Sequence, residues 1–470
     1  TLGAQTIGTG VLYDCDELET VTIKGTVNTI GNDAFYSCGA LKDVTFSPSP
    51  TNEGLKLYCQ TYLGSVQGPF HDAPLVSANW DRTITLHGNS TGVWGLFEGK
   101  SALTSVTIGS QVQKIPLNTF KGAGLTSITI PANISEIECD AFLNCDALHT
   151  VIISPSENGL ALYHQSDDYG PFYDSPLSRI ELGRTIRSKH GNQLFSPSEK
   201  KAGVFASEES VDEVTVTIGS NVSMVGPYMF NGLNIKSIEI PSSVGEVSHN
   251  AFNDCDELTT VTVGAQIVSE GAFYDCDALH TVTIKGTVNT IGNDVFYSCG
   301  ALKNVTFEES TTGSTLTIGY QTVDYVVSTD EQGPFHDAPL EKVDWRRNIS
   351  YTLANKGAVD GNDEGLFSGK STLTNVNIGA QVNSIPPYTF AGAGFTAIWV
   401  PREVTSIGDY AFAGSSLQTL TCNHSTPPTL GTNVFKDCLS SISVVQGSKQ
   451  AFIDAGWSSY GTIYVWVPQN

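Results

Sequence analysis

The sequence contains the motif GPFHDAPL twice and a variant, GPFYDSPL, once. The two full copies place a histidine directly before an aspartate, as His71–Asp72 and His336–Asp337. A histidine beside a carboxylate could act as a general base. In the variant, however, Tyr173 replaces the histidine, and adjacent side chains in a turn or strand seldom face each other. The sequence also has no GxSxG, HExxH or phosphate-binding loop. We therefore interpret the motif as a structural turn and predict no catalytic residues and no enzyme.

Acidic residues raise the possibility of a calcium site. The segment DGNDEG at 360–365 resembles the start of a calcium loop, but Ser371 stands where the twelfth-position glutamate would be. Paired aspartates also flank a cysteine at three places, and like charges stacked on neighbouring strands repel and could recruit a cation. These pairs are Asp14/Asp16, Asp254/Asp256 and Asp275/Asp277. Solvated turns are the favoured interpretation, so no cofactor is predicted, and calcium at the acidic loops stays open as the alternative.

Seven of the ten cysteines share one position, three residues after an aromatic residue or its equivalent, Leu12. They are Cys15, Cys38, Cys145, Cys255, Cys276, Cys299 and Cys438. Zinc requires ligands that converge on one point, whereas a position repeated along the chain distributes its residues. We therefore predict a structural column of buried, free thiols, which pack as small apolar side chains. Cys59, Cys139 and Cys422 lie outside this column.

The cysteines mark a repeat of about 23 residues, typified by LETVTIKGTVNTIGNDAFYSCGA at 18–40 and copied from Leu125 and Leu279. Within each copy, a segment such as LTSVTIG at 103–109 alternates apolar and polar residues, which predicts a strand with one buried face. The following VxxI segment predicts a second side of each coil. The AFxxC segment predicts a tight helical or 3₁₀ turn. Stacked copies give a β-rich solenoid in which each coil covers its neighbour.

The repeats predict two parts, a solenoid over 1–438 of about sixteen repeats plus a partial first one, and a capping segment over 439–470. Within the cap, SKQAFIDAGW at 448–457 predicts a short amphipathic helix. Six insertions interrupt the repeats, and insertions in a solenoid tend to emerge on one face as loops or hairpins used in recognition. They occupy 47–67, 84–95, 154–169, 186–204, 308–332 and 349–365.

Charge and hydropathy exclude several classes of partner. The 470 residues carry 48 Asp and Glu against 24 Lys and Arg, a net charge of −24, which disfavours nucleic acid and anionic membranes. No apolar run approaches the roughly 18 residues of a membrane-spanning helix.

Residues 1–46 match 262–307 almost throughout, so the sequence begins within a repeat. We therefore expect a signal peptide or lipid anchor upstream of Thr1.

The pattern LTSVTIPxxVxxIGxxAFxxC, the TPP turn ending at Pro428 and the closing VxxGSxxAFxxAGWSxYxxI resemble the BspA-like (Treponema pallidum-type) leucine-rich repeat proteins. The resemblance covers essentially the whole chain. It implies a right-handed stack of coils with a parallel sheet on the concave face and short 3₁₀ or helical turns elsewhere. It also implies a secreted or cell-surface protein, typically from a Bacteroidetes bacterium. The function it implies is adhesion or ligand binding, and it transfers no functional residue.

Candidate binding residues are aromatic side chains at outward positions or in the insertions, the composition that binding surfaces favour. Trp399 falls at an outward strand position, whereas Trp80 and Trp345 fall at inward ones and should be core. The insertion candidates are Tyr58, Tyr62, Trp94, Tyr163, His164, Tyr169, Tyr320 and Tyr325. We predict a non-enzymatic, monomeric adhesion protein that binds host extracellular or mucosal proteins, glycoproteins or other microbes. The alternative is a glycan-binding surface module of a gut bacterium.

Overall fold

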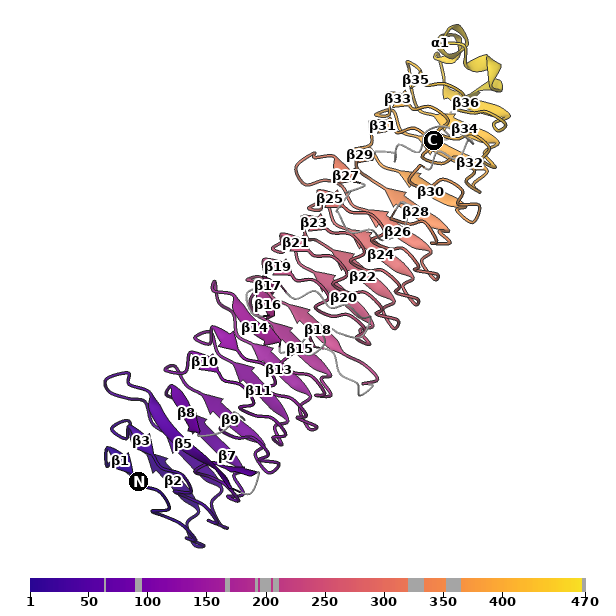
Figure 1. Cartoon of the computed structure of the whole chain (residues 1–470). Helices are drawn as coiled ribbons and strands as arrows, with labels where there is room; N and C mark the ends of the chain where they lie inside the picture. The colour runs from indigo at the N-terminus through magenta and orange to yellow at the C-terminus, as the bar shows by residue number, and fades with distance from the viewer. Residues whose placement is uncertain are drawn as a thin grey trace. The chain divides into compact units, whose positions relative to one another are not determined.

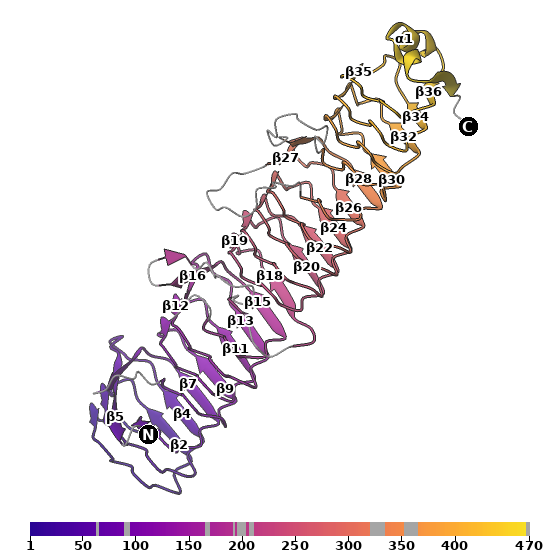
Figure 2. The same ribbon diagram turned by 45° about the vertical axis from the view of Figure 1, so that its right-hand side comes forward.

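The protein forms two compact units, Thr1–Asn234 and Ile235–Asn470, each a stack of β-coils (Figures 1 and 2). A computed structural model describes residues 1–62, 65–88, 95–164, 170–190, 193–194, 204–205, 211–319, 334–351 and 365–466.

Each coil contributes a long and a short strand, as β11 (Ser127–Ile130) and β12 (Glu136–Ile137) illustrate. In β11, Ile128 and Ile130 are buried whereas the alternate residues, Ser127 and Thr129, are exposed. This alternation arises because successive side chains of a strand point to opposite faces. The predicted strand with one buried face is therefore confirmed.

The long strands of the first unit pair in parallel in two sheets, β2-β4-β7-β9 and β11-β13-β15-β18. Adjacent strands match position for position, so that Ile128 faces Val151 and Val151 faces Ile180. The remaining long strands are β2 (Thr20–Ile23), β4 (Asp43–Phe46), β7 (Ser77–Trp80), β9 (Ser105–Ile108), β13 (Thr150–Ile153), β15 (Arg179–Leu182) and β18 (Thr215–Ile218).

The second sides of these coils form separate sheets, β1-β3-β5-β6 with β8 beside β5, and β10-β12-β14-β16-β17. Their strands are β1 (Thr6–Ile7), β3 (Thr29–Ile30), β5 (Leu55–Tyr62), β6 (Ser65–Gln67), β8 (Ile84–Gly88), β10 (Lys114–Ile115), β14 (Leu160–His164), β16 (Ile186–His190) and β17 (Gln193–Leu194). One further short strand of this unit is β19 (Met224–Val225).

The second unit repeats this plan, with long-strand sheets β20-β22-β24-β26-β28-β30 and β32-β34-β36-β37. These strands are β20 (Ser237–Ile240), β22 (Thr260–Val263), β24 (Thr281–Ile284), β26 (Asn304–Phe307), β28 (Lys342–Trp345), β30 (Asn375–Ile378), β32 (Ala397–Val400), β34 (Thr419–Cys422), β36 (Ser441–Val445) and β37 (Thr462–Trp466). The short strands are β21 (Glu246–Val247), β23 (Ile267–Val268), β25 (Thr290–Ile291), β27 (Leu316–Ile318), β29 (Ile349–Tyr351), β31 (Ser384–Ile385), β33 (Ser406–Ile407) and β35 (Thr429–Leu430).

A ladder of stacked phenylalanines runs through the core of each unit. In the first unit, centroids of successive rings lie 4.9–5.9 Å apart along Phe97, Phe120, Phe142, Phe172, Phe205 and Phe230. In the second, they lie 5.0–6.1 Å apart along Phe252, Phe273, Phe296, Phe335, Phe367, Phe390, Phe412 and Phe435. Each ring therefore buries its faces against the rings of the coils before and after it.

Most of the turns around the ladder phenylalanines contain left-handed residues. Beside Phe142, Asp140 has a φ of 53° and Asn144 has a φ of 55°. Glycine adopts this conformation freely, and asparagine and aspartate tolerate it better than other residues do. The predicted tight turn is present, and its left-handed residues prevent it from continuing as a right-handed helix.

The insertions begin by lengthening the short strands. β5, within the predicted insertion 47–67, pairs in parallel with β3 and β8, and β14 pairs in the same way with β12 and β16. In the second unit, β27 pairs with β25 and β29. Antiparallel hairpins then follow in two of them, β5 with β6 and β16 with β17. The insertions are therefore rooted in the short-strand sheets.

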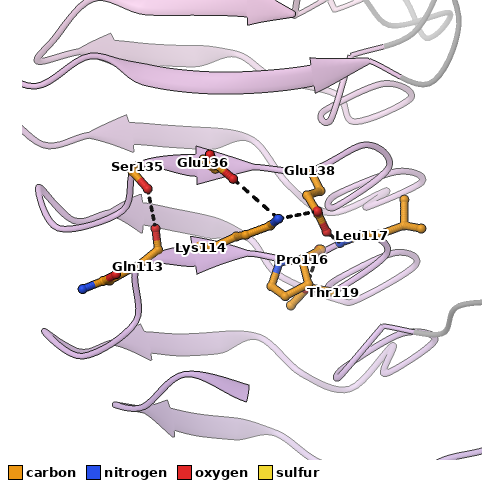
Figure 3. A network of polar contacts seen from close by, with 8 residues as sticks. All are labelled: Gln113, Lys114, Pro116, Leu117, Thr119, Ser135, Glu136 and Glu138. Atoms are coloured by element: carbon orange, nitrogen blue, oxygen red, sulfur yellow. Dashed lines mark hydrogen bonds and ion pairs between the residues drawn. The ribbon is translucent and has the colours of Figure 1, made fainter. Parts of the chain in front are cut away.

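Ion pairs link neighbouring short strands at the surface (Figure 3). Lys114 Nζ of β10 lies 2.5 Å from Glu138 Oε1 and 3.5 Å from Glu136 Oε2. Glu138 Oε2 also accepts a hydrogen bond from the backbone N–H of Leu117 at 2.8 Å. Burial acts to lower the pKa of Lys114, but hydrogen bonds to Glu138 and the charges of both glutamates outweigh it and raise the pKa.

The C-terminal segment adds strands to the last sheet before and after a small helical element. β36 pairs with β34, and β37 pairs with β36, both in parallel. Between them, α1 (Lys449–Asp454) and the 3₁₀ turn Trp457–Ser459 bury Phe452 and Trp457, whose ring centroids lie 4.9 Å apart. The helix predicted at 448–457 is confirmed, although the α-helical part is shorter. No helix in the described part of the chain is long and apolar enough to cross a membrane.

We predict that Phe142→Ala lowers the free energy of unfolding of the first unit by about 3–5 kcal/mol, because it removes a fully buried ring between two stacked partners. Urea unfolding followed by circular dichroism would measure this, with Thr129→Ala as the exposed control. Equal unfolding midpoints for the two variants would show that the ladder contributes little stability.

Candidate functional site

The repeated cysteines lie against the backbone of the preceding coil. Cys145 Sγ donates to the carbonyl oxygen of Phe120 at 3.0 Å, and Cys276 Sγ donates in the same way to Phe252 at 3.2 Å. Burial raises the pKa of the Cys145 thiol to about 12. Cys38, Cys145, Cys255, Cys276 and Cys299 are buried, Cys15 and Cys438 are half-buried, and all seven are free. The column therefore supplies weak donors to carbonyl groups inside the stack.

Other donors occupy the same position in coils that lack cysteine. Ser175 Oγ donates to the carbonyl of Phe142 at 2.9 Å. Lys100 Nζ donates to the carbonyls of Phe70 at 2.6 Å and Ala73 at 3.2 Å. In these coils the side chain satisfies a buried carbonyl that would be costly to leave unpaired, whereas small apolar residues such as Ala123 and Ala393 hold the same position in other coils.

The aspartates beside the cysteines have a conformational explanation. Asp14, Asp254 and Asp275 have left-handed backbones, with φ values of 56°, 60° and 57°. Each lies two residues after the phenylalanine of its turn or, for Asp14, after the equivalent residue Leu12. Among described residues, no group of three or more His, Cys, Asp or Glu side chains is placed to hold a metal ion. Of the segment DGNDEG, only Gly365 lies within the described residues.

The histidine–aspartate pairs do face each other, contrary to the expectation for adjacent residues. His71 Nδ1 lies 3.3 Å from Asp72 Oδ2, and His336 Nδ1 lies 2.8 Å from Asp337 Oδ1. In the first pair, the left-handed backbone of Asp72, with a φ of 57°, provides the reversal that brings the carboxylate back towards the ring.

Each of these histidines ends a row of stacked rings. Tyr13, Tyr36 and His71 have successive centroid distances of 5.1 and 5.3 Å. The charge of Asp72 is the main cause that raises the pKa of Tyr36. The matching row of the second unit is Tyr274, Tyr297 and His336, at 5.3 and 6.0 Å. The motif thus packs the outer side of the turn, in agreement with a structural role.

Three fully buried arginines were missed by the sequence reasoning. Arg82 donates from Nη1 to the carbonyl of Val27 at 2.8 Å and from Nη2 to that of Glu53 at 3.0 Å. Arg184 and Arg347 are also 0% exposed and likewise donate to backbone carbonyls. Burial lowers the pKa of all three guanidinium groups. A pattern in the sequence could have revealed them. The matched segments WDRTI, LGRTI and WRRNI each place an arginine two residues before an insertion, those at 84–95, 186–204 and 349–365.

Two predicted binding residues are exposed aromatics. Tyr58, 44% exposed on β5, stacks on His87 of β8 with a centroid distance of 5.3 Å. Trp399, at the centre of β32, is 45% exposed, whereas Trp80 and Trp345 are core residues at 1%. The core assignment of Trp80 and Trp345 is therefore confirmed.

Some of the other insertion candidates lie within the described residues. Tyr163 is half-buried on β14 and is the register partner of Lys189 on β16. Tyr62 and His164 are the last residues of β5 and β14. Trp94, Tyr169, Tyr320 and Tyr325 lie outside the described residues.

A further exposed aromatic, Tyr464, was not predicted. It lies at the outward centre of β37 and is 56% exposed. The sequence TIYVW consists of the β-branched and aromatic residues that strands favour, but it follows the helix of the cap, where the repeat pattern predicts only capping structure.

Parallel strands stacked coil upon coil around buried leucines and phenylalanines define a leucine-rich repeat solenoid. The BspA type leucine-rich repeat region matches the chain in six copies, over residues 3–70, 94–164, 200–316 and 363–455. The chain belongs to this family. Membership indicates a role in protein interaction and agrees with the fold predicted from the repeats.

Several solved leucine-rich repeat structures are similar to the chain. One from Bacteroides ovatus is 18% identical, with 98% of this chain and 87% of that chain covered and a TM-score of 0.33. A leucine-rich cell surface protein from Faecalibacterium prausnitzii is 21% identical, with 65% and 84% covered and a TM-score of 0.22. The pneumococcal vaccine antigen PcpA is 17% identical, with 77% and 86% covered and a TM-score of 0.24. None of the curated proteins compared with the chain matches it.

We predict that the nine cysteines other than Cys59 are all titrated by a thiol reagent after denaturation, because the structure contains them as free thiols. In the folded protein at pH 8, Cys145 should stay unmodified, since burial and its raised pKa of about 12 suppress the thiolate. Mass spectrometry of alkylated peptides would locate the modified residues. Blocked thiols in the denatured chain would contradict the free column.

We also predict a pH-dependent stability contribution from Lys100. Burial lowers its pKa from 10.5 to about 8, against the charge of Asp72, which acts to raise it. Between pH 8 and pH 10.5, Lys100 therefore holds its proton in the unfolded chain but has lost it in the folded protein. The free energy of unfolding consequently rises with pH across this range. Relative to Lys100→Met, the wild type should gain up to about 3 kcal/mol from pH 7 to pH 10.5. Urea unfolding of both proteins across this range would measure the gain, and a pH-independent difference would contradict it.

Proposed function

We propose that the protein is a non-enzymatic adhesion protein, secreted or held at the cell surface, that binds extracellular partners. Its partners are host extracellular or mucosal proteins, glycoproteins, or the surfaces of other microbes. Binding uses the outward faces of the long-strand sheets and the surfaces built by the insertions. Family membership supports the interaction role, and the location is the one that the resemblance to BspA-like proteins implies.

The observation that carries this proposal is the exposed stack of Tyr58 and His87. Both residues lie on strands lengthened by insertions, β5 and β8, whose parallel pairing holds the two rings side by side. Tyrosine offers a large contact area with little conformational entropy to lose on binding. Arg82 anchors the insertion that carries Tyr58, because it donates to the carbonyl of Glu53 just before β5. The aromatic surface is therefore held in place before a ligand arrives, which lowers the cost of association.

A second function, the binding of glycans at the surface of a gut bacterium, is favoured by the exposure of Trp399. Exposed aromatic rings can stack on the apolar faces of sugar rings. This residue lies on a long-strand sheet of the second unit, separate from the insertion strands β5 and β8.

We predict that Tyr58→Ala, alone or with His87→Ala, weakens binding to a host protein ligand at least tenfold, as expected for a preorganised aromatic anchor. Surface plasmon resonance against immobilised matrix and mucosal proteins would measure the affinity. Tyr13→Ala provides a matched control, because Tyr13 is an exposed tyrosine, 54% accessible, outside the insertions.

The protein panel should include each glycoprotein before and after enzymatic deglycosylation. Affinity that survives deglycosylation and falls in Tyr58→Ala supports a protein ligand at the insertion strands. Failure of the wild-type protein to bind any panel member, or turnover of a substrate, would overturn the proposal.

A further inference from the structure

The last long-strand sheet of the second unit presents an aromatic residue on each of its outer strands. Trp399 of β32 faces Thr421 of β34, Thr421 faces Ser443 of β36, and Ser443 faces Tyr464 of β37. Trp399 and Tyr464 are 45% and 56% exposed. Three strand spacings of about 4.8 Å place the two backbone positions about 14 Å apart. The rings thus flank a strip in which the two intervening side chains are small hydroxyls.

The strip between the rings is lined by hydroxyl groups in two rows. Thr421 and Ser443 form the row between the aromatics, and Thr419 and Ser441 form a second row two residues earlier on the same strands. Thr419 Oγ1 and Ser441 Oγ lie 3.1 Å apart and hydrogen bond to each other. A hydroxyl both donates and accepts, so this surface can satisfy a ligand that carries many hydroxyls of its own.

Within its described strands, this face has no ionisable side chain other than the tyrosine, although the chain as a whole has a net charge of −24. Its outward residues include Ala397, Trp399 and Tyr464, together with the four threonines and serines of the strip. The six-stranded sheet of the same unit differs, since its outward positions include Glu239 and Asp344. An uncharged face in an acidic protein is complementary to a neutral ligand, because ions would lose hydration there without gaining a partner.

A hollow adjoins this face at the amino ends of β36 and β37. Its volume is about 530 Å³, and its lining includes the hydroxyl-bearing residues Ser440, Ser458, Ser459 and Thr462, with Lys449 as its one amine. Thr462 also lies on β37, the strand that carries Tyr464. A chain ligand that crosses the sheet therefore has a second hydroxyl-rich surface into which it can extend.

We propose that this face binds a neutral oligosaccharide, with one sugar ring stacked on Trp399, another on Tyr464, and the intervening hydroxyls on Thr421 and Ser443. A pyranose has an apolar face of C–H groups and a rim of hydroxyls, which matches aromatic rings separated by a hydroxyl floor. An extended peptide would instead pair its backbone with the edge strand β37, as peptides do at open sheet edges. The inference deepens the proposed function, on which it rests, by naming the ligand class of one surface.

The experiment is a binding screen of the full chain against neutral gluco-, galacto-, manno- and xylo-oligosaccharides, with heparin and polygalacturonate as anionic probes. Isothermal titration calorimetry would then measure the affinity of the best neutral ligand. We expect Trp399→Ala and Tyr464→Ala each to weaken this affinity at least tenfold. Trp399→Phe should retain part of it, because a ring remains, and Ser443→Asp should weaken it through an unpaired charge in the strip. The anionic probes should not bind.

Tyr13→Ala is the matched control, because it removes a tyrosine of comparable exposure, 54%, from the first unit and should leave sugar affinity unchanged. Circular dichroism would verify that every variant is folded. Absence of binding to all neutral oligosaccharides, or unchanged affinity in Trp399→Ala and Tyr464→Ala, would overturn the inference. If protein ligands still bind through Tyr58 in that case, the proposed function stands and only the sugar site fails.

Discussion

Each coil of this protein depends on its neighbours to satisfy its backbone polar groups and to cover its apolar side chains. At the turns, the backbone N–H of Phe120 donates to the carbonyl of Ala141 at 2.8 Å, and that of Gly122 donates to Leu143 at 2.9 Å. The Phe120 carbonyl in turn accepts the Cys145 thiol. Several carbonyls at this place accept a hydrogen bond from a cysteine, serine or lysine of the next coil, whereas alanine takes the same position in other coils.

The same constraint explains how the insertions are accommodated. Arg82 and Arg347 each donate both to a carbonyl of the coil before an insertion and to a carbonyl within that insertion. Arg82 and Arg347 contact equivalent carbonyls, those of Val27 and Val288, at 2.8 Å in both units. Burial of a guanidinium costs free energy, which these hydrogen bonds offset while they fix the base of each insertion. The insertion strands are consequently hydrogen-bonded extensions of the short-strand sheets where the structure describes them.

The fold could be predicted because its signals are local and repeated. Alternation in LTSVTIG and the shared cysteine position are enough to indicate the strands and the coil period from the sequence alone. The close approach of His71 and Asp72 was not predictable from adjacency, because it depends on the backbone and side-chain angles that the turn adopts. Arg82 was missed because charged residues are usually exposed, and its carbonyl partner Val27 lies 55 residues away in sequence. Tyr464 was missed because a helix precedes its strand, even though Thr462 follows its register partner Ser441 at a spacing close to the repeat period.

The division between inward and outward positions also determines where ligand specificity can arise. Inward side chains such as Ile398 and Leu420 are buried against adjacent coils, so a change there alters stability first. Outward side chains on the same strands, Trp399 and Thr421, are not needed to cover a neighbour, and their identity can change at little cost to the fold. A tryptophan that is 45% exposed leaves a large part of its apolar surface uncovered by its own sheet, and that part adds nothing to stability. A role for this surface is therefore to be sought in contacts outside the chain, and the outward aromatic residues of this sheet, rather than the repeated core, are where the proposed ligand binding can be tested.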